Sequence, residues 1–194
     1  MAQRPLILAS SSPYRRSLLE RLGVPFEVAR PGVDEAAVAG ETPENRAARL
    51  SLAKACAVAS QRRGAVVIGS DQVAALGPHV LDKPGDEATC RAQLAELSGS
   101  SAHFFTGCTV VCLEAQLSLE HVDVTTVQFR SLSAAEIERY VARERPLDCA
   151  GGFKVEALGI TLFERIENSD PTALIGLPLV WLASALRRAG YELP

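Results

Sequence analysis

The chain has 194 residues, of which 47% are hydrophobic and 22% charged, and this is the composition of an ordinary soluble globular protein. Its formal net charge of -3 leaves no basic surplus for a long run of nucleic-acid phosphates, whereas a small anionic ligand needs only a local cluster of donors. The N-terminal apolar run is too short for an export signal, and the apolar stretch 173–186 falls short of the ~20 residues that span a bilayer. We therefore expect a cytoplasmic protein that binds neither nucleic acid nor membrane.

The cysteines and the basic residues give two compositional signals. The five cysteines are odd in number and show no C-x-x-C spacing, which favours reduced core thiols over zinc sites or disulfides. Only three of the 20 basic residues are lysines, namely Lys54, Lys83 and Lys154. Because arginine has taken the other positions, we expect these lysines to mark places that need a compact ammonium rather than a planar fork.

The predicted elements alternate between strands and helices in the first half of the chain. Strands are expected over residues 6–9, 26–29, 65–76, 103–114, 118–130 and 151–166. Helices are expected over residues 14–22, 42–61, 86–99, 133–143 and 178–189. The two long strands in the middle are predicted to pair antiparallel. This order predicts an α/β fold with a mixed sheet, and the absence of repeats and linkers predicts one domain over residues 1–194.

A strand-to-helix turn gives the first candidate site. The segment 10–16, Ser-Ser-Ser-Pro-Tyr-Arg-Arg, directs backbone N–H groups and the positive end of the following helix to one point. Its serine hydroxyls add donors, and Arg15 or Arg16 can reach back as a charged clamp. The turn lacks the glycines and the lysine of a P-loop, and Ser12 followed by Pro13 also fits plain helix capping. Taken together, the serines and arginines favour an anion site.

Two charged residues fall inside otherwise apolar elements. Lys54 lies on the apolar stripe of the predicted helix 42–61, four residues after Leu50, so it must either snorkel to solvent or meet a partner. Asp71 lies inside the apolar strand 65–76, where a carboxylate is costly unless it is satisfied. It is either a structural hydrogen-bond hub or a general-base and metal-ligand candidate, and we favour the second interpretation.

Acidic residues in an irregular segment add a possible cation site. Glu35 follows Asp34 within the segment 31–40, for which we expect neither helix nor strand. Alone these carboxylates would be surface charges. Together with Asp71 they are candidate ligands for Mg²⁺, which takes carboxylates and substrate phosphates and keeps several waters.

The remaining two lysines also lie beside acidic residues. Lys83 is in the loop that follows the strand of Asp71. Lys154 and Glu156 are in the strand-like region 151–166, and strand alternation places both on one face.

At these segments the chain closely resembles the Maf family of nucleotide pyrophosphatases, and the resemblance covers nearly its whole length. The matching motifs are Leu-Ala-Ser-Ser-Ser-Pro-Tyr-Arg-Arg from Leu8, Val33-Asp34-Glu35, Lys54-Ala55, Gly69-Ser70-Asp71-Gln72, Lys83-Pro84, Gly151-Gly152-Phe153-Lys154-Val155-Glu156, Asp170-Pro171 and Gly176-Leu177-Pro178-Leu179. All three lysines fall inside them. The resemblance implies an elongated mixed β-sheet flanked by helices, with two lobes around a central cleft as in ITPase-like proteins, and a homodimer.

The same resemblance implies an activity and a role for each matched residue. Water would attack a small-molecule nucleoside triphosphate with the help of Mg²⁺ or Mn²⁺, and pyrophosphate would leave. Asp71 would be the proton acceptor that activates the water, and Glu35 and Asp71 would lie near the metal. The phosphates would be held by Ser10, Ser12, Arg15, Lys54 and Lys83.

Within the family, Gln72 and Glu156 resemble the branch that acts on 7-methyl-GTP, a housekeeping removal of modified nucleotides. The 7-methylguanine ring is cationic, so stacking on Tyr14 gains about 0.5–2 kcal/mol, and the carboxylate of Glu156 can accept both N–H groups of the Watson–Crick edge. A thymine edge would present a carbonyl to that carboxylate and be rejected. Branch members carry Trp where Tyr14 stands, and family members often carry glycine where Asp82 stands.

Other functions remain open at this point. A dTTP/UTP pyrophosphatase would keep the chemistry, but that branch usually carries Thr and Gln at the positions of Gln72 and Glu156. A non-catalytic nucleotide-binding regulator of cell division or septum formation, a role historically attached to the family, would have no need of a buried activating carboxylate such as Asp71. An RNA-binding module is disfavoured by the acidic balance and the lack of an aromatic-basic surface.

Overall fold

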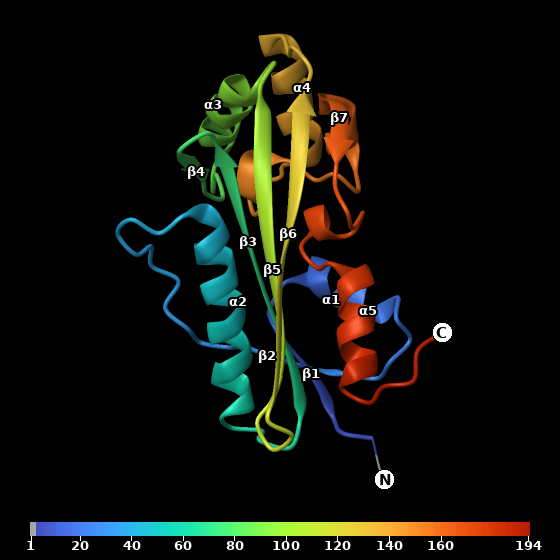
Figure 1. Ribbon diagram of the computed structural model, residues 1–194. Coiled ribbons are helices and arrows are strands. Elements are labelled where there is room, and N and C mark those ends of the chain that lie inside the picture. The colour runs from blue at the N-terminus through green and yellow to red at the C-terminus, as the bar shows by residue number, and fades with distance from the viewer. Residues whose placement is uncertain (1–2) are drawn as a thin grey trace. The chain divides into compact units, whose positions relative to one another are not determined.

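The computed structural model describes residues 3–194, which form one mixed sheet and its covering helices (Figure 1). The strands are β1 (Leu6–Ala9), β2 (Glu27–Ala29), β3 (Val66–Leu76), β4 (His79–Leu81), β5 (Ser101–Cys112), β6 (Leu117–Phe129) and β7 (Phe163–Glu167). The α-helices are α1 (Pro13–Glu20), α2 (Pro43–Ala59), α3 (Glu87–Leu97), α4 (Ala134–Glu144) and α5 (Leu179–Arg188). Three 3-10 helices complete the fold, η1 (Ala150–Gly152), η2 (Leu158–Leu162) and η3 (Ala173–Ile175). None of the helices in this part of the chain has the length and apolar character needed to cross a bilayer.

The sheet confirms the predicted fold class. Its strands follow the order β2-β1-β3-β5-β6-β7, with the short β4, for which we predicted no strand, paired to β3. β1 pairs parallel with both β2 and β3, whereas β4 pairs antiparallel with β3 and β7 with β6. A turn over residues 113–116 joins the neighbouring strands β5 and β6, and so short a connection requires the predicted antiparallel pair.

The chain divides into two compact units. The first holds the chain up to Asp71 together with Thr106–Asp123 and Asp170–Pro194, and the second holds Gln72–Phe105 and Val124–Ser169. The long strands β3, β5 and β6 each contribute residues to both units. The central cleft expected for the family stays a prediction.

Strand alternation gives the first unit a core on each face of its sheet. In β1, Leu6 and Leu8 pack with α1 and α5, while Ile7 and Ala9 pack with α2 on the opposite face (Figure 1). Ser12 caps α1 as predicted, with Pro13 at the first helical position. Both faces of β1 are therefore buried, which is why this strand is apolar throughout.

Two glycines let α2 lie directly on the sheet of the first unit. A Cβ at Gly69 of β3 would stand 2.2 Å from the carbonyl oxygen of Ser51, and one at Gly107 of β5 would stand 2.3 Å from that of Ala47. The hydroxyl groups of Ser51 and Thr109 are 2.9 Å apart and hydrogen-bonded at the same contact. The helix backbone is therefore locked against β3, and this contact fixes where the next turn of α2 places its side chains.

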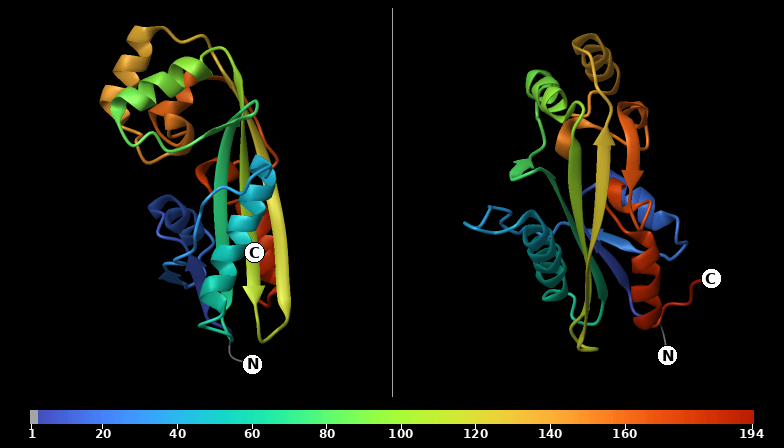
Figure 2. Two further views of the ribbon diagram at one scale, coloured as in Figure 1. Left: turned by 90° about the vertical axis from the view of Figure 1, so that its left-hand side faces the viewer. Right: turned by 45° about the horizontal axis from the view of Figure 1, so that its top comes forward.

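The second unit packs α3 beside α4 (Figure 2). It also contains an aromatic cluster. The ring of Phe153 makes edge-on contacts with Phe104, Phe129 and Phe163 at centroid distances of 5.2, 5.7 and 4.8 Å. The helix predicted to begin at Ser133 is confirmed, and Ser133 and Glu136 form a capping box in which they exchange side-chain to backbone hydrogen bonds at the start of α4.

The strand predicted over residues 151–166 is wrong for most of its length. Gly151 and Gly152 have φ angles of 75° and 69°, a left-handed conformation that glycine allows and a strand does not, so they form η1 instead. The next residues close a turn in which the N–H of Gly159 donates to the carbonyl of Lys154 at 3.0 Å. Lys154 and Glu156 consequently do not share one strand face.

Candidate active site

The candidate site begins where β1 ends. Ala9, the last residue of β1, pairs with Gly69, and β3 continues past that point through Ser70 and Asp71. The carboxyl end of a parallel strand is where ligands bind in open α/β sheets. Because successive strand residues point to opposite faces, Ser70 and Asp71 address different sides of this edge.

Lys54 meets two carboxylates rather than reaching solvent. Its Nζ lies 2.6 Å from Oδ1 of Asp71 and 2.7 Å from Oε1 of Glu35. The side chains of Lys54 and Asp71 are only 7% and 10% exposed, so the pair lies largely out of water. A buried charge is tolerated only with such partners, and the locked position of α2 supplies them. Three residues that the sequence predicted for one site therefore do come together.

The two carboxylates fit a divalent cation that also binds substrate. Asp71 and Glu35 come from different elements and converge on one ammonium, so the space around them already stabilises positive charge. No group of three or more His, Cys, Asp or Glu side chains within residues 3–194 forms a metal site by itself. This donor set suits Mg²⁺, which is commonly held by one or two carboxylates and completed by phosphate oxygens and water.

Arg15 of α1 brings a second cation to the site. Its Nε donates to the carbonyl of Gly176 at 2.9 Å, and the hydroxyl of Ser70 donates to the same oxygen at 2.9 Å. Burial lowers the pKa of Arg15 from its ordinary value, while the carboxylates of Asp71 and Glu35 act in the opposite direction. An arginine remains charged through such a shift, so Arg15 faces these carboxylates as a cation.

The segment that supplies the Gly176 carbonyl is itself held by a buried carboxylate. Asp170 accepts hydrogen bonds from the N–H groups of Thr172 and Val180 at 2.9 and 2.6 Å. Gly176 has a φ of 123°, which favours glycine at this turn. Gly176 and Ser70 both lie in the sequence motifs. The structure adds that Ser70 and Arg15 donate to the same Gly176 carbonyl, which orients Arg15.

The serines of the first motif line the start of α1. The N–H of Ser12 donates to Oγ of Ser10 at 3.1 Å, and the N–H of Arg15 donates to Oγ of Ser12 at 3.4 Å. Ser12 is thus the helix cap that the sequence also allowed. Each hydroxyl accepts in these bonds and keeps its own proton as a donor for an anion.

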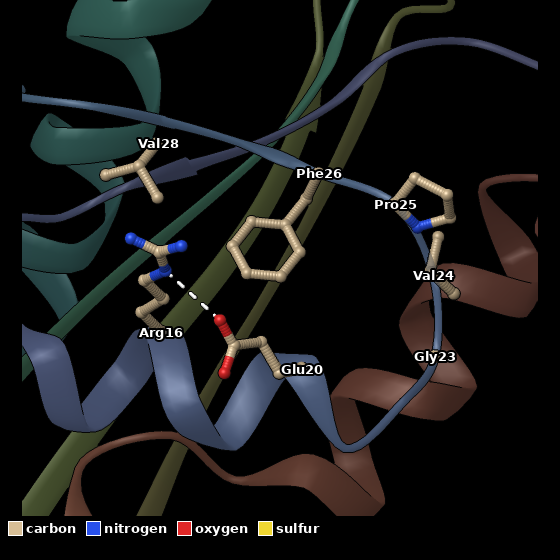
Figure 3. A pocket seen from close by; sticks show the side chains of 7 residues that line it. All are labelled: Arg16, Glu20, Gly23, Val24, Pro25, Phe26 and Val28. Carbon is tan, nitrogen blue, oxygen red and sulfur yellow. Dashed lines mark hydrogen bonds and ion pairs between the residues drawn. The ribbon is translucent and has the colours of Figure 1, made fainter.

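The two successive arginines do different things. Arg16 lines a pocket of about 470 Å³, where its Nε pairs with Oε1 of Glu20 at 3.1 Å (Figure 3). The pocket is lined by Arg16, Glu20, Gly23, Val24, Pro25, Phe26 and Val28. None of the predicted site residues lines it, so of the two arginines only Arg15 remains a candidate for the predicted clamp.

The residues predicted to select the base are divided between the units, and Lys83, predicted to bind phosphate, lies apart from the other phosphate residues in the second unit. Tyr14 lies in α1 of the first unit and is partly exposed, whereas Gln72 in β3, Lys83 after β4 and Glu156 in the turn before η2 belong to the second unit. Lys83 and Glu156 are exposed. The metal and most phosphate residues are therefore assembled within one unit.

A buried lysine between a buried and an exposed carboxylate, at the end of parallel strands and beside an arginine and a serine-lined helix start, is an arrangement that suits a phosphorylated ligand and a cation in an α/β protein. A family model described as Maf-like protein matches residues 5–189. The chain therefore belongs to the Maf family.

Full-length relatives extend this assignment. A protein of Albidiferax ferrireducens named 7-methyl-GTP pyrophosphatase is 52% identical over 190 residues, which cover 98% of this chain and 96% of the relative. Proteins with the same name from Xanthomonas oryzae pv. oryzae and Aromatoleum aromaticum are 52% and 51% identical and cover 97% and 100% of this chain, and 98% and 100% of their own. The solved structure of the Staphylococcus aureus Ham1 protein, at 14% identity and a TM-score of 0.46, covers 65% of this chain and 72% of its own, a likeness too weak to inform fold or function.

Proposed function

We propose that this chain is a nucleotide pyrophosphatase that hydrolyses 7-methyl-GTP to 7-methyl-GMP and pyrophosphate. The observation that carries the proposal is the contact of the buried Lys54 with two carboxylates, the buried Asp71 and the exposed Glu35. The names of the full-length relatives at 51–52% identity support the substrate and the reaction.

The reaction needs a proton acceptor and charge stabilisation at the leaving group. The oxygen of water attacks the α-phosphorus, the bond from that phosphorus to the bridging oxygen breaks, and the electron pair leaves with pyrophosphate. Asp71 accepts the proton that the attacking water loses, because it is a carboxylate held in place within the site. Its hydrogen bond to Lys54 fixes the orientation of the carboxylate.

The basic residues stabilise the charge that builds up on the leaving group. Lys54 and Arg15 are fixed before substrate arrives, Lys54 by two ion pairs and Arg15 by the Gly176 carbonyl. Fixed cations in a site with little water are worth more than mobile ones, because they need no reorganisation during the reaction. We assign Ser10, Ser12 and Lys83 to the remaining phosphate oxygens.

Mg²⁺ or Mn²⁺ is proposed as the cofactor. Glu35 and Asp71 would hold the ion together with phosphate oxygens, and the ion would neutralise charge on the triphosphate. The chain's own residues still supply the proton acceptor and the fixed cations.

Base selection is assigned to Tyr14, Gln72 and Glu156. The cationic 7-methylguanine ring suits an aromatic platform and a carboxylate, and an uncharged pyrimidine does not offer both interactions. Glu156 is exposed in its turn, so its carboxylate is accessible to a base edge.

We further propose a cytoplasmic homodimer. The free thiols of all five cysteines support a reducing compartment. The homodimer is proposed from the family resemblance.

The test is pyrophosphate release from a panel of 7-methyl-GTP, GTP, dTTP, UTP, CTP and ATP, with Mg²⁺ and with Mn²⁺, beside an Asp71→Asn control. Release from 7-methyl-GTP that is lost in the control is the expected result. Release from dTTP or UTP instead would keep the chemistry and overturn the substrate. Absence of release from every nucleotide would favour the regulator of cell division.

A further inference from the structure

The loop that carries Glu35 has no regular structure of its own. Residues 30–42 connect β2 to α2 without helix or strand, yet Oε1 of Glu35 lies 2.7 Å from Nζ of Lys54. The Glu35 side chain is 56% exposed, so packing around that side chain contributes little to holding it. Something else must fix the backbone of this loop.

Two arginines of α2 hold the loop by its backbone. Nη2 of Arg46 donates to the carbonyl of Glu35 at 3.3 Å, and Nη2 of Arg49 donates to the carbonyl of Ala36 at 3.2 Å. These are successive peptide carbonyls of the loop, and they are bound from residues one turn apart on the helix. The helix that presents Lys54 therefore also sets the position of the residue that Lys54 meets.

Arg49 additionally grips the far end of the loop. Its Nε and Nη2 bind the two oxygens of Glu41 at 2.6 and 2.7 Å, a two-pronged contact. The Glu41 side chain is only 10% exposed and that of Arg49 35%, so solvent screens this pair less than an ordinary surface pair. The hydrogen bonds from Arg49 are also the main cause of a lowered pKa at Glu41.

We infer that Arg49 is a positioning residue of the active site, which through Glu41 and the Ala36 carbonyl holds the loop so that Glu35 reaches Lys54 and Asp71. The inference rests on the proposed function, because it assigns Arg49 an effect on that same reaction. Arg49 touches no reacting group in this role. Arg49 also interacts electrostatically with Asp71, and its positioning role is the separate effect that it has through the place it gives Glu35.

A matched pair of variants separates this role from general stabilisation. Arg49→Met is expected to lower kcat/KM about 10- to 100-fold, since a displacement of about 1 Å costs that much in an organised site. Arg62→Met breaks a similar two-oxygen contact to Glu27 at the end of α2, away from the site, and is expected to leave kcat/KM unchanged. Equal losses in both variants, or no loss in Arg49→Met, would overturn the inference.

The decisive measurement is a double-mutant cycle with Glu35→Gln. If Arg49 acts through Glu35, Arg49→Met should change kcat/KM by less than about 3-fold once Glu35 is already replaced. The same 10- to 100-fold loss in both backgrounds would overturn the role. A wild-type protein inactive on every nucleotide would instead refute the proposed function, so the two failures are distinguishable.

Arg49→Lys tests geometry against charge. Lysine keeps the positive charge but cannot make the forked contact and a third bond to Ala36, so it is expected to behave like Arg49→Met. Full recovery of kcat/KM with lysine would show that charge alone matters and would overturn the positioning role.

Hydrogen exchange gives a readout that needs no activity. The amide of Ala36 donates to Oδ1 of Asp34 at 2.9 Å, and that of Glu41 donates to the carbonyl of Val38 at 3.1 Å. Both amides should exchange about 10-fold faster in Arg49→Met, because loosened segments open at lower free energy. Glu41→Gln, which leaves the arginine in place, should give the same change if Arg49→Met does not fold. Unchanged exchange rates of both amides in these variants would refute the positioning role of Arg49, whatever the activity.

Discussion

Lys54 in the first unit and Lys154 in the second both lie beside a glutamate, but their surroundings differ. Lys54 is 7% exposed and contacts two carboxylates at 2.6 and 2.7 Å, whereas Lys154 is 19% exposed and its Nζ lies 3.8 Å from Glu144. The backbone of Lys154 also makes hydrogen bonds that hold its segment: its N–H donates to the hydroxyl of Tyr140, and its carbonyl accepts from the N–H of Gly159. The first region is built from side-chain charge, and the second is a backbone frame that presents Glu156.

This difference predicts that substitutions in the first region abolish the chemistry and that substitutions in the second change the choice of substrate. Asp71→Asn should have the largest effect, a loss of about 10²- to 10⁴-fold in kcat on every nucleotide, the range expected for a lost general base. Pyrophosphate release checks this, and thermal unfolding should show a folded protein. Activity within a few-fold of wild type would remove Asp71 from its role.

Lys54→Met should follow in size. It removes a fixed cation, which we expect to cost about 10²- to 10³-fold in kcat. It also leaves the buried Asp71 carboxylate unpaired, for which a destabilisation of about 3–5 kcal/mol is typical. Urea unfolding and kinetics on the same sample measure both effects. Unaltered stability would show that the ion pair is balanced by its desolvation.

The sequence predicts the helices and strands that carry the site residues, but it does not predict the contacts between them. A short apolar run predicted β1, and capping residues predicted α1 and α2, because each signal is local. Lys54 and Asp71 stood out because a charge in an apolar element needs a partner. The contacts of Arg49 with the loop could not be predicted from the sequence, because an arginine on a helix is usually a solvated surface residue. The strand predicted from Gly151 onward is wrong because the apolar composition of the segment favours a strand, whereas Gly151 and Gly152 adopt the left-handed conformation.

In the second region Glu156→Gln should alter preference rather than chemistry. Hydrogen bonds to a charged acceptor are worth about 1.5–3 kcal/mol, so kcat/KM for 7-methyl-GTP should fall about 10- to 100-fold. Values for the other nucleotides should stay near those of the unaltered protein. Parallel losses across the whole panel would place Glu156 in the chemistry and erase the contrast between the two regions.

The smallest effect is expected at the cap of α4, the helix that carries Tyr140 and Glu144. Hydrogen bonds from the N–H and hydroxyl of Ser133, then from Arg130, lower the pKa of Glu136 from 4.5 to about 2. Because the pKa of Glu136 is lower in the folded than in the unfolded state, Glu136 stabilises the protein at a pH above the unfolded-state pKa of 4.5. This contribution is lost as the pH falls from about 4.5 to 2.

Glu136→Gln should therefore lower the thermal midpoint slightly at neutral pH and flatten its decline in that acidic range. Thermal scans from pH 7 to pH 2 on both proteins measure the difference. An identical acid profile in the variant would show that the capping box adds nothing to the pH dependence.

The charged side chains at the candidate site of the first unit neutralise one another. Two cations, Lys54 and Arg15, face two carboxylates, Asp71 and Glu35, so their formal charges cancel. In the proposed function, a triphosphate and its metal would therefore enter by exchanging partners with groups that are already satisfied. Much of the attraction gained on binding replaces attraction given up, which moderates ground-state affinity and leaves the cations available for the charge that develops later. The same neutrality means that the charges of these four side chains balance one another without a metal, unlike those of domains whose metal supplies their folding energy.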